Sequence, residues 1–262
     1  MIVCADDYGL REDIDRAILE LCSLNKLSAV SCMVLFKRCD AKVLSGLLAH
    51  QAKLDIGLHL CLTDEGLPLA LPPPECKLSE YKSLFWRSVL RRINPQDIFQ
   101  LISVQYEFFV MKCGRRPDHI DGHLHAHQLP GVRTALADFV RSLPAEHRPY
   151  VRNTRISVGA IRRLNLPWLK AVFIGVFGRR LQSALRAVNA PTNDGFAGIY
   201  AFKHWRRYPG YLPKFADCLP EPNGILVVHP GLEEAWRRQE FESLRNFVAL
   251  DGRLNRFQRP SS

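Results

Sequence analysis

The chain has no uninterrupted apolar stretch long enough to cross a bilayer, although hydrophobic residues make up 47% of its 262 residues. Its first residues, Met-Ile-Val-Cys-Ala-Asp-Asp, also lack the basic region of a secretory signal and place two acids directly after a short apolar run. These absences argue against a transmembrane helix and against a leader peptide. We therefore expect a cytoplasmic protein, with peripheral contact at a membrane surface as the alternative considered below.

Paired cysteines are missing as well. The chain contains eight cysteines, but none of them form a Cys-x-x-Cys pair, and they are scattered through apolar segments. In a chain of this size, that pattern favours buried, reduced thiols over a disulfide framework or a zinc knot.

A nucleic-acid-binding motif is the third absence. The formal net charge of +10 would attract phosphates, nucleic acids or anionic lipids. The basic residues, however, are spread along the chain rather than gathered in a recognisable motif. We expect a solvated basic surface and no nucleic-acid partner, with attraction to an anionic surface or substrate as the alternative.

What the chain does contain is a regular alternation of short apolar runs and longer helical patterns. No break in composition divides it, so we expect one domain over residues 1–262. Expected strands are Met1–Ala5, Ala29–Phe36, Ile56–Leu62, His119–His123, Tyr150–Asn153, Phe196–Ala201 and Ile225–His229. Expected helices are Arg11–Leu24, Ala41–Ala49, Leu78–Ile93, Gln96–Cys113, Val132–Leu143 and Glu233–Leu250. This alternation predicts an α/β fold, a TIM-like variant (β/α) barrel of about seven parallel strands.

Two segments stand outside this alternation. The proline-rich segment Leu67–Pro74 is expected to be a long surface loop. The apolar segment Leu164–Val188, which ends in arginines, is too short to span a membrane. We favour a buried barrel helix with a basic end, and the alternative is a helix that lies on an anionic membrane surface or faces a lipid-linked substrate.

A histidine-rich segment carries the strongest chemical pattern. His119, Asp121, His123, His125 and His127 alternate with other residues, so they share one face as far as a strand continues. Five ionisable groups on one face are costly in a core, and a metal or proton-transfer role relieves that conflict. Because a strand rises roughly 3.3 Å per residue, the first and last would lie about 26 Å apart, so one or two at most bind the same ion.

Other polar residues follow the expected strands, where a parallel barrel collects its functional groups at one rim. Asp6 and Asp7 end the first strand, and a glycine turn after them would let both enter a pocket with different tasks. His59 and His229 end two further apolar strands, and Arg152 follows the fifth. An aspartate with two histidines leaves a position for water on a bound ion. The ion lowers the pKa of that water, and a free carboxylate and a histidine move the protons. This pattern predicts a metal-dependent hydrolase.

Four segments resemble the YdjC-like family of carbohydrate deacetylases. They are Ala5–Leu10, Ile56–Leu60, His119–His127 and Val228–Gly231, and they bracket almost the whole chain. The resemblance implies a variant (β/α) barrel that holds one divalent cation, magnesium or zinc. It also implies that a metal-bound water hydrolyses the N-acetyl group of an amino sugar.

The resemblance also assigns roles to individual residues. It implies that Asp7, His59 and His123 bind the metal and that Asp6 is the general base. His229 would be the acid that protonates the amine, and Arg152 would hold Asp6 in place. His119, Asp121, His125 and His127 would support these groups or contact substrate. Gly122 and Leu124 depart from the residues that relatives often carry, serine and a further histidine.

Two other functions fit the same residues. The positive charge would suit a metallophosphoesterase. The chain could also be a sugar- or lipid-glycan-binding protein that keeps a metal without turnover. The presence of every catalytic group favours the deacetylase, whose partner would be an acetylated amino sugar, free or lipid-linked.

Overall fold

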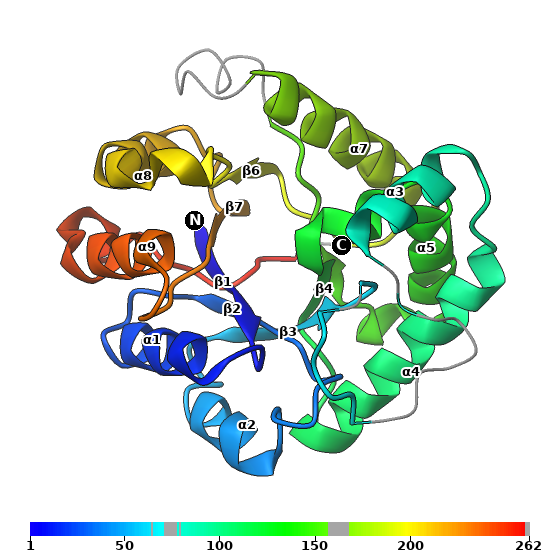
Figure 1. The fold of residues 1–262 in the computed structure, drawn as a ribbon, viewed down its shortest axis with the longest axis horizontal. Coiled ribbons are helices and arrows are strands. Elements are labelled where there is room, and N and C mark those ends of the chain that lie inside the picture. Colours follow the sequence, from blue (N-terminus) through cyan, green and yellow to red (C-terminus); the bar gives the residue numbers. More distant parts are fainter. Residues whose placement is uncertain (64, 71–77, 79, 157–167, 260–262) are drawn as a thin grey trace.

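Seven parallel strands form one curled sheet at the centre of the protein, seen in a computed structural model (Figure 1). The structure describes residues 1–63, 65–70, 78, 80–156 and 168–259. The strand order is β5-β4-β3-β2-β1-β7-β6. The strands are β1 Ile2–Tyr8, β2 Ala29–Cys32, β3 Asp55–Leu60, β4 His119–Gly122, β5 Tyr150–Val151, β6 Gly195–Ala197 and β7 Gly224–Val228. The predicted α/β fold with seven parallel strands is confirmed.

The helices lie around the outside of this sheet (Figure 1). They are α1 Glu12–Ser23, α2 Ala41–Leu48, α3 Tyr81–Val89, α4 Pro95–Cys113, α5 Val132–Ser142, α7 Trp168–Ala187, α8 Tyr208–Asp217 and α9 Ala235–Asn246. Short 3-10 helices are η1 His123–Gln128, η2 Ala145–His147, η3 Phe202–Arg207 and η4 Val248–Leu250. None of the helices in the described part of the chain is long and apolar enough to cross a membrane.

Local sequence explains where these elements begin and end. In α1, Ile14, Ile18 and Leu21 recur at helical spacing and are fully buried against the sheet. Helix α4 begins at Pro95, where a missing N–H costs nothing, and the Asn94 side chain accepts a hydrogen bond from the first turn. It ends at a glycine in the left-handed conformation, the usual residue for such a helix end.

In the described part of the chain, the two edges of the curled sheet are joined by irregular chain and not by an eighth strand. Strands β5 and β6 are the two edges of the sheet. Between them, Val151 forms a parallel bridge with Thr192, and its N–H donates to the Pro191 carbonyl over 2.8 Å. The side chains of Asn153 and Asn193 add hydrogen bonds to the backbone across the same seam. We call this junction of 151–153 with 191–193 the seam.

The main departures from the predicted elements lie at their ends. The second strand stops at Cys32 rather than Phe36, because the following apolar residues turn into a separate small cluster. Helix α8 was not predicted, since Pro209, Gly210 and Pro213 disguise its helical pattern. The predicted loop 67–74 is described only to residue 70, and the apolar segment 164–188 only from residue 168, where α7 begins. The seven described cysteines are free, as predicted.

Candidate active site

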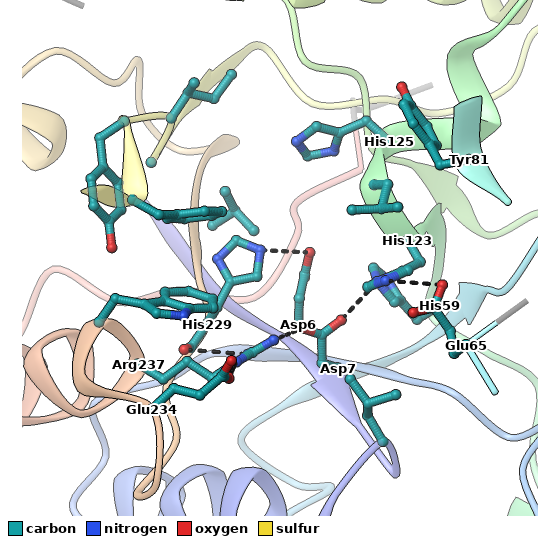
Figure 2. Close-up of a pocket in the computed structure, with 18 of the residues that line it drawn as sticks. Asp6, Asp7, His59, Glu65, Tyr81, His123, His125, His229, Glu234 and Arg237 are labelled. Carbon is teal, nitrogen blue, oxygen red and sulfur yellow. Dashed lines mark hydrogen bonds and ion pairs between the residues drawn. The ribbon is translucent and has the colours of Figure 1, made fainter. Parts of the chain in front are cut away.

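A cavity of about 560 Å³ opens at the carboxyl ends of the strands. Asp6 and Asp7 from β1, His59 from β3, His123 after β4 and His229 after β7 all line it (Figure 2). The structure thus brings together the residues that the sequence placed on one rim. This is the position at which parallel barrels collect functional groups.

Three of these side chains converge on one point. Oδ1 of Asp7 lies 3.0 Å from Nδ1 of His123 and 3.5 Å from Nε2 of His59. One ligand atom from each residue lies within 4.8 Å of the other two. Asp7 has a φ of 71°, an unusual conformation for a residue other than glycine that turns its side chain toward the two rings.

The far side of each imidazole is held by a second carboxylate. Nδ1 of His59 lies 2.6 Å from Oδ1 of the fully buried Asp121. Nε2 of His123 lies 3.6 Å from Oε1 of Glu65. Metal-binding histidines in proteins are usually oriented in this way, with the second ring nitrogen bonded to a carboxylate. The donor set and its surroundings therefore fit a divalent cation bound by Asp7, His59 and His123.

The same contacts set the charge of the cluster. Burial by itself would lower the pKa of His59, but Asp121 and Asp6 outweigh it and raise that pKa to about 10. Burial is likewise outweighed by Asp7 at His123, whose pKa is raised to about 9. Burial opposes ionisation of Asp7, yet its histidine neighbours hold its pKa well below the ordinary value. The cluster therefore attracts positive charge, either as protons or as a cation.

Asp6 has different partners. Arg152, fully buried after β5, donates from Nη1 and Nη2 to the two oxygens of Asp6, both over 2.7 Å. Nη2 of the same arginine lies 2.9 Å from Oδ2 of Asp121. On the cavity side, Oδ2 of Asp6 lies 3.9 Å from Nε2 of His229. Arg152 thus fixes the Asp6 carboxylate, which faces His229 across the cavity.

His229 rests on a buried glutamate from α9. Its backbone N–H donates to Oε2 of Glu240 over 2.6 Å, and Tyr200 donates its hydroxyl to Oε1 over 2.7 Å. Burial is the largest cause that lowers the pKa of His229, to about 4, and burial raises that of Glu240 to about 7. His229 is therefore a neutral imidazole near pH 7.

Helix α9 and one loop contribute residues that the sequence did not single out. Arg237 donates from Nη2 to Oδ2 of Asp7 over 2.7 Å. Glu234, Arg237 and Glu240 recur every three residues, so this face of α9 is turned toward the site. That spacing was the one available sequence pattern. Glu65 lies in an irregular loop with no such pattern.

The other histidines of the 119–127 segment lie in different surroundings, because β4 ends at Gly122 and η1 begins at His123. The His125 ring faces the cavity (Figure 2), while Nε2 of His127 lies 2.8 Å from the Arg152 carbonyl oxygen. A Cβ at Gly122 would lie 3.0 Å from Cβ and Nδ1 of His127, so glycine allows the close approach of the two residues at this turn. Leu124 and His125 both have a positive φ, and such strain is typical of functional turns.

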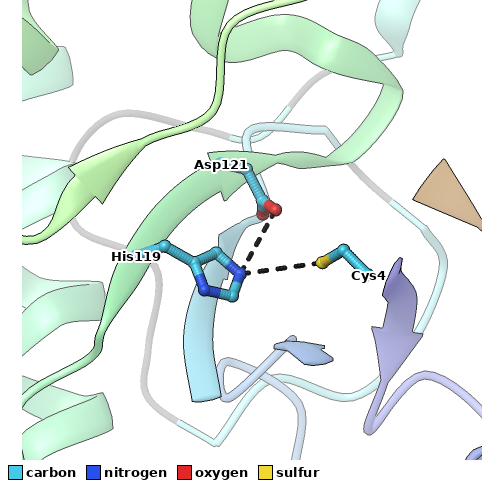
Figure 3. Close-up of side chains that lie close together, drawn as sticks. All are labelled: Cys4, His119 and Asp121. Atoms are coloured by element: carbon cyan, nitrogen blue, oxygen red, sulfur yellow. Dashed lines mark hydrogen bonds and ion pairs between the residues drawn. The ribbon is translucent and has the colours of Figure 1, made fainter. Parts of the chain in front are cut away.

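His119 lies deeper, beside Cys4 and Asp121 (Figure 3). Its Nε2 is 3.6 Å from Oδ2 of Asp121 and 3.9 Å from the Cys4 sulfur. The Ser31 hydroxyl lies between them, 2.9 Å from His119 and 2.6 Å from Asp121. Arg152 and His59 also contact Asp121, so this hydrogen-bonded group is continuous with the cluster around Asp7.

A model of the YdjC-like protein family matches residues 1–250. The chain belongs to the YdjC-like family. The predicted family is thus confirmed.

One relative matches part of the chain. A chitooligosaccharide deacetylase of Enterobacter sp. (strain 638) is 31% identical over 140 residues, which are 53% of this chain and 54% of that protein. The match thus spans about half the length of this relative.

A solved structure matches over nearly the whole chain. It is an Enterococcus faecalis V583 protein, provisionally described as a cellobiose-phosphate cleavage protein. The two share a TM-score of 0.68 over 97% of this chain and 96% of that chain, at 19% identity. At that identity the likeness shows the fold alone.

Proposed function

We propose that the protein is a metal-dependent hydrolase that removes the N-acetyl group from an amino sugar. The observation that carries this proposal is the division of the cavity into two sets of groups. Asp7, His59 and His123 converge as one set, and Asp6 faces His229 as the other. The name of the Enterobacter relative, a chitooligosaccharide deacetylase, supports the same reaction.

Asp7, His59 and His123 are the proposed ligands of one divalent cation. When bound, such a cation polarises the acetyl carbonyl and lowers the pKa of water beside it. One carboxylate and two imidazoles suit zinc, and magnesium is the alternative. Asp121 and Glu65 keep the two rings turned toward Asp7.

Asp6 is the proposed general base. Its two hydrogen bonds from Arg152 fix the orientation of the carboxylate, which is thereby placed to accept a proton from the attacking water. His229 is neutral in the free site, so the proton that it gives to the leaving nitrogen has to be acquired during the reaction. The 3.9 Å between Asp6 and His229 offers a short path for it.

An acetylated amino sugar would lie along the wall opposite the cation ligands. That wall contains Tyr200, Phe202 and Trp236, and the last two rings are stacked with centroids 4.3 Å apart. Aromatic faces with a few placed polar groups are typical of small-molecule sites. We propose that His125 contacts the sugar, and that His119, Asp121 and His127 support the catalytic groups from below. A lipid-linked sugar would place its apolar portion against the same wall.

The test is metal analysis of the purified protein, followed by mass-spectrometric screening of acetylated amino sugars for loss of an acetyl group. We expect stoichiometric divalent metal and release of acetate from at least one sugar. A phosphoester panel in parallel tests the metallophosphoesterase. Binding of acetylated glycans by the loaded protein without any acetate release would reject the proposed reaction in favour of a binding protein.

A further inference from the structure

Arg237 is a buried cation that directly contacts a proposed metal ligand. Its side chain is 8% exposed, and Nη2 donates to Oδ2 of Asp7 over 2.7 Å. Nε donates to Glu234 over 2.8 Å, Nη1 reaches the His229 carbonyl over 3.4 Å, and the guanidinium lies over the Trp236 ring. These contacts fix the guanidinium plane on several sides.

The two oxygens of Asp7 are therefore divided between two partners. Oδ1 faces His123 and His59, and Oδ2 is held by Arg237 (Figure 2). A carboxylate can bind a cation through one oxygen or through both. Here one of the two is already committed to a charge-assisted hydrogen bond, which is stronger than a neutral one.

Neighbouring residues keep Arg237 from moving away. Glu234 is itself held by Arg11, whose Nη2 donates to Oε2 over 2.8 Å. Behind the guanidinium, the turn at Gly231 is packed closely, because a Cβ there would come within 3.0 Å of the Arg237 side chain. The arginine is thus set in position by its surroundings rather than by Asp7 alone.

We propose that Arg237 is a positioning residue of the cation site, which holds Oδ2 of Asp7 and leaves Oδ1 as the single carboxylate oxygen for a divalent cation. The inference rests on the metal site of the proposed function. Asp7 then gives one ligand atom, and the two imidazoles give two more. The remaining coordination positions stay open toward the cavity, as hydrolytic sites require.

Positioning and simple charge predict opposite effects on cation affinity. A guanidinium near the cation repels it, so if charge were the whole role, removal of Arg237 would tighten binding. If Arg237 acts by orienting Asp7, its removal frees the carboxylate and weakens binding. Loss of a residue that orients a metal ligand typically weakens binding by about 10–100-fold.

The experiment measures Co²⁺ binding by competition with a chelator, together with the visible absorption of the bound Co²⁺. Arg237→Met keeps the stem against Trp236 and removes the donors, and Arg237→Gln is a second uncharged variant should the first not fold. We expect about 10–100-fold weaker binding and a changed Co²⁺ spectrum in either, with partial recovery in Arg237→Lys. Arg238→Met is the matched control, since the exposed side chain of this neighbour donates to the Leu232 carbonyl and to no site residue in the described structure.

A double-variant comparison tests the route of the effect. In Asp7→Ala, which keeps both imidazoles of the site, adding Arg237→Met should change the Co²⁺ affinity by less than about threefold, because the residue through which Arg237 acts is gone. Equal or tighter Co²⁺ binding in the single variant with an unchanged spectrum would overturn the proposal. So would an undiminished loss in the Asp7→Ala background. Neither readout needs turnover, so failure to release acetate would count against the proposed reaction alone.

Discussion

Asp6 and Asp7 are consecutive residues, yet each carboxylate is held by its own buried arginine from a different part of the chain. Arg152 after β5 holds Asp6, and Arg237 in α9 holds Asp7. In a regular strand, neighbouring side chains point to opposite faces. Here the register of β1 shifts between Ala5 and Tyr8, and Asp7 adopts a positive φ. Both carboxylates therefore enter one cavity with separate tasks.

Asp6→Asn is expected to lower kcat/KM for acetate release by about 10²–10⁴-fold, the usual contribution of a general base. The amide cannot accept the proton from water, whereas the cation ligands remain in place. Acetate release and bound metal are measured on the same preparation. Full activity at unchanged metal content would remove Asp6 from its role, and loss of metal in this variant would show that it acts on the cation site instead.

Asp121→Asn should weaken cation binding by about 10–100-fold. Oδ1 of Asp121 fixes the His59 ring over 2.6 Å, and the neutral amide orients it less strongly. Chelator competition gives the affinity. Asp118→Asn is a matched control, because this aspartate precedes the same strand at its far end and bonds Arg115 and the Ile56 N–H, not the His59 ring. Similar losses in both variants would point to a general effect on β4.

Cation binding is expected to release protons. His59 and His123 have pKa values raised to about 10 and about 9, and each has to lose a proton before its nitrogen binds a cation. Near pH 7, binding should therefore release about two protons per ion. Affinity should rise steeply with pH up to about 9, the pKa of His123, and less steeply from there to about 10, the pKa of His59. Calorimetry in buffers of different ionisation enthalpy counts the protons, and a count of zero contradicts the ligand assignment.

The raised pKa of Glu240 predicts that the free energy of unfolding depends on pH differently in the wild type and in Glu240→Gln. Burial raises its pKa from 4.5 to about 7, so the folded state binds its proton more tightly than the unfolded chain does. This stabilising contribution is complete below about pH 4.5 and is lost as the pH rises through about 7. The free energy of unfolding of the wild type, relative to Glu240→Gln, should fall over that range by up to about 3 kcal/mol.

Urea unfolding at about pH 5 and about pH 8 measures this difference. Glu242→Gln is the matched control on the exposed side of the same helix, and its difference from the wild type should stay constant. A constant difference for Glu240→Gln as well would mean that Glu240 is ionised in the folded protein throughout.

The fold was predictable because its strands and helices differ in period, and the rim was predictable because polar residues follow buried strands. Asp6, Asp7, His59 and His229 each stand at such a boundary. The alternation of side chains along a strand could not predict where the histidines beyond β4 lie. The chain turns into η1 at His123, and the side chains separate there.

Arg237, Glu240 and Glu65 escaped prediction for a different reason. They reach the site only through the way α9 and a loop pack onto the sheet, and local sequence does not determine that packing. The spacing of charged residues on one face of α9 is the only local sequence pattern that indicates this packing. Arg152 was predicted as a site residue because it follows an expected strand and because the family resemblance implies a role for it.

The seam between β5 and β6 has a consequence for catalysis. Residues 151–153 form one side of it, and Arg152, which orients Asp6, is the middle residue of the three. A strand ladder resists separation cooperatively, whereas a junction of one bridge and a few side-chain bonds can widen locally. The orientation of the proposed base thus depends on a junction without a strand ladder, and we expect sequence changes at Thr192 or Asn193 to alter turnover although neither residue lines the cavity.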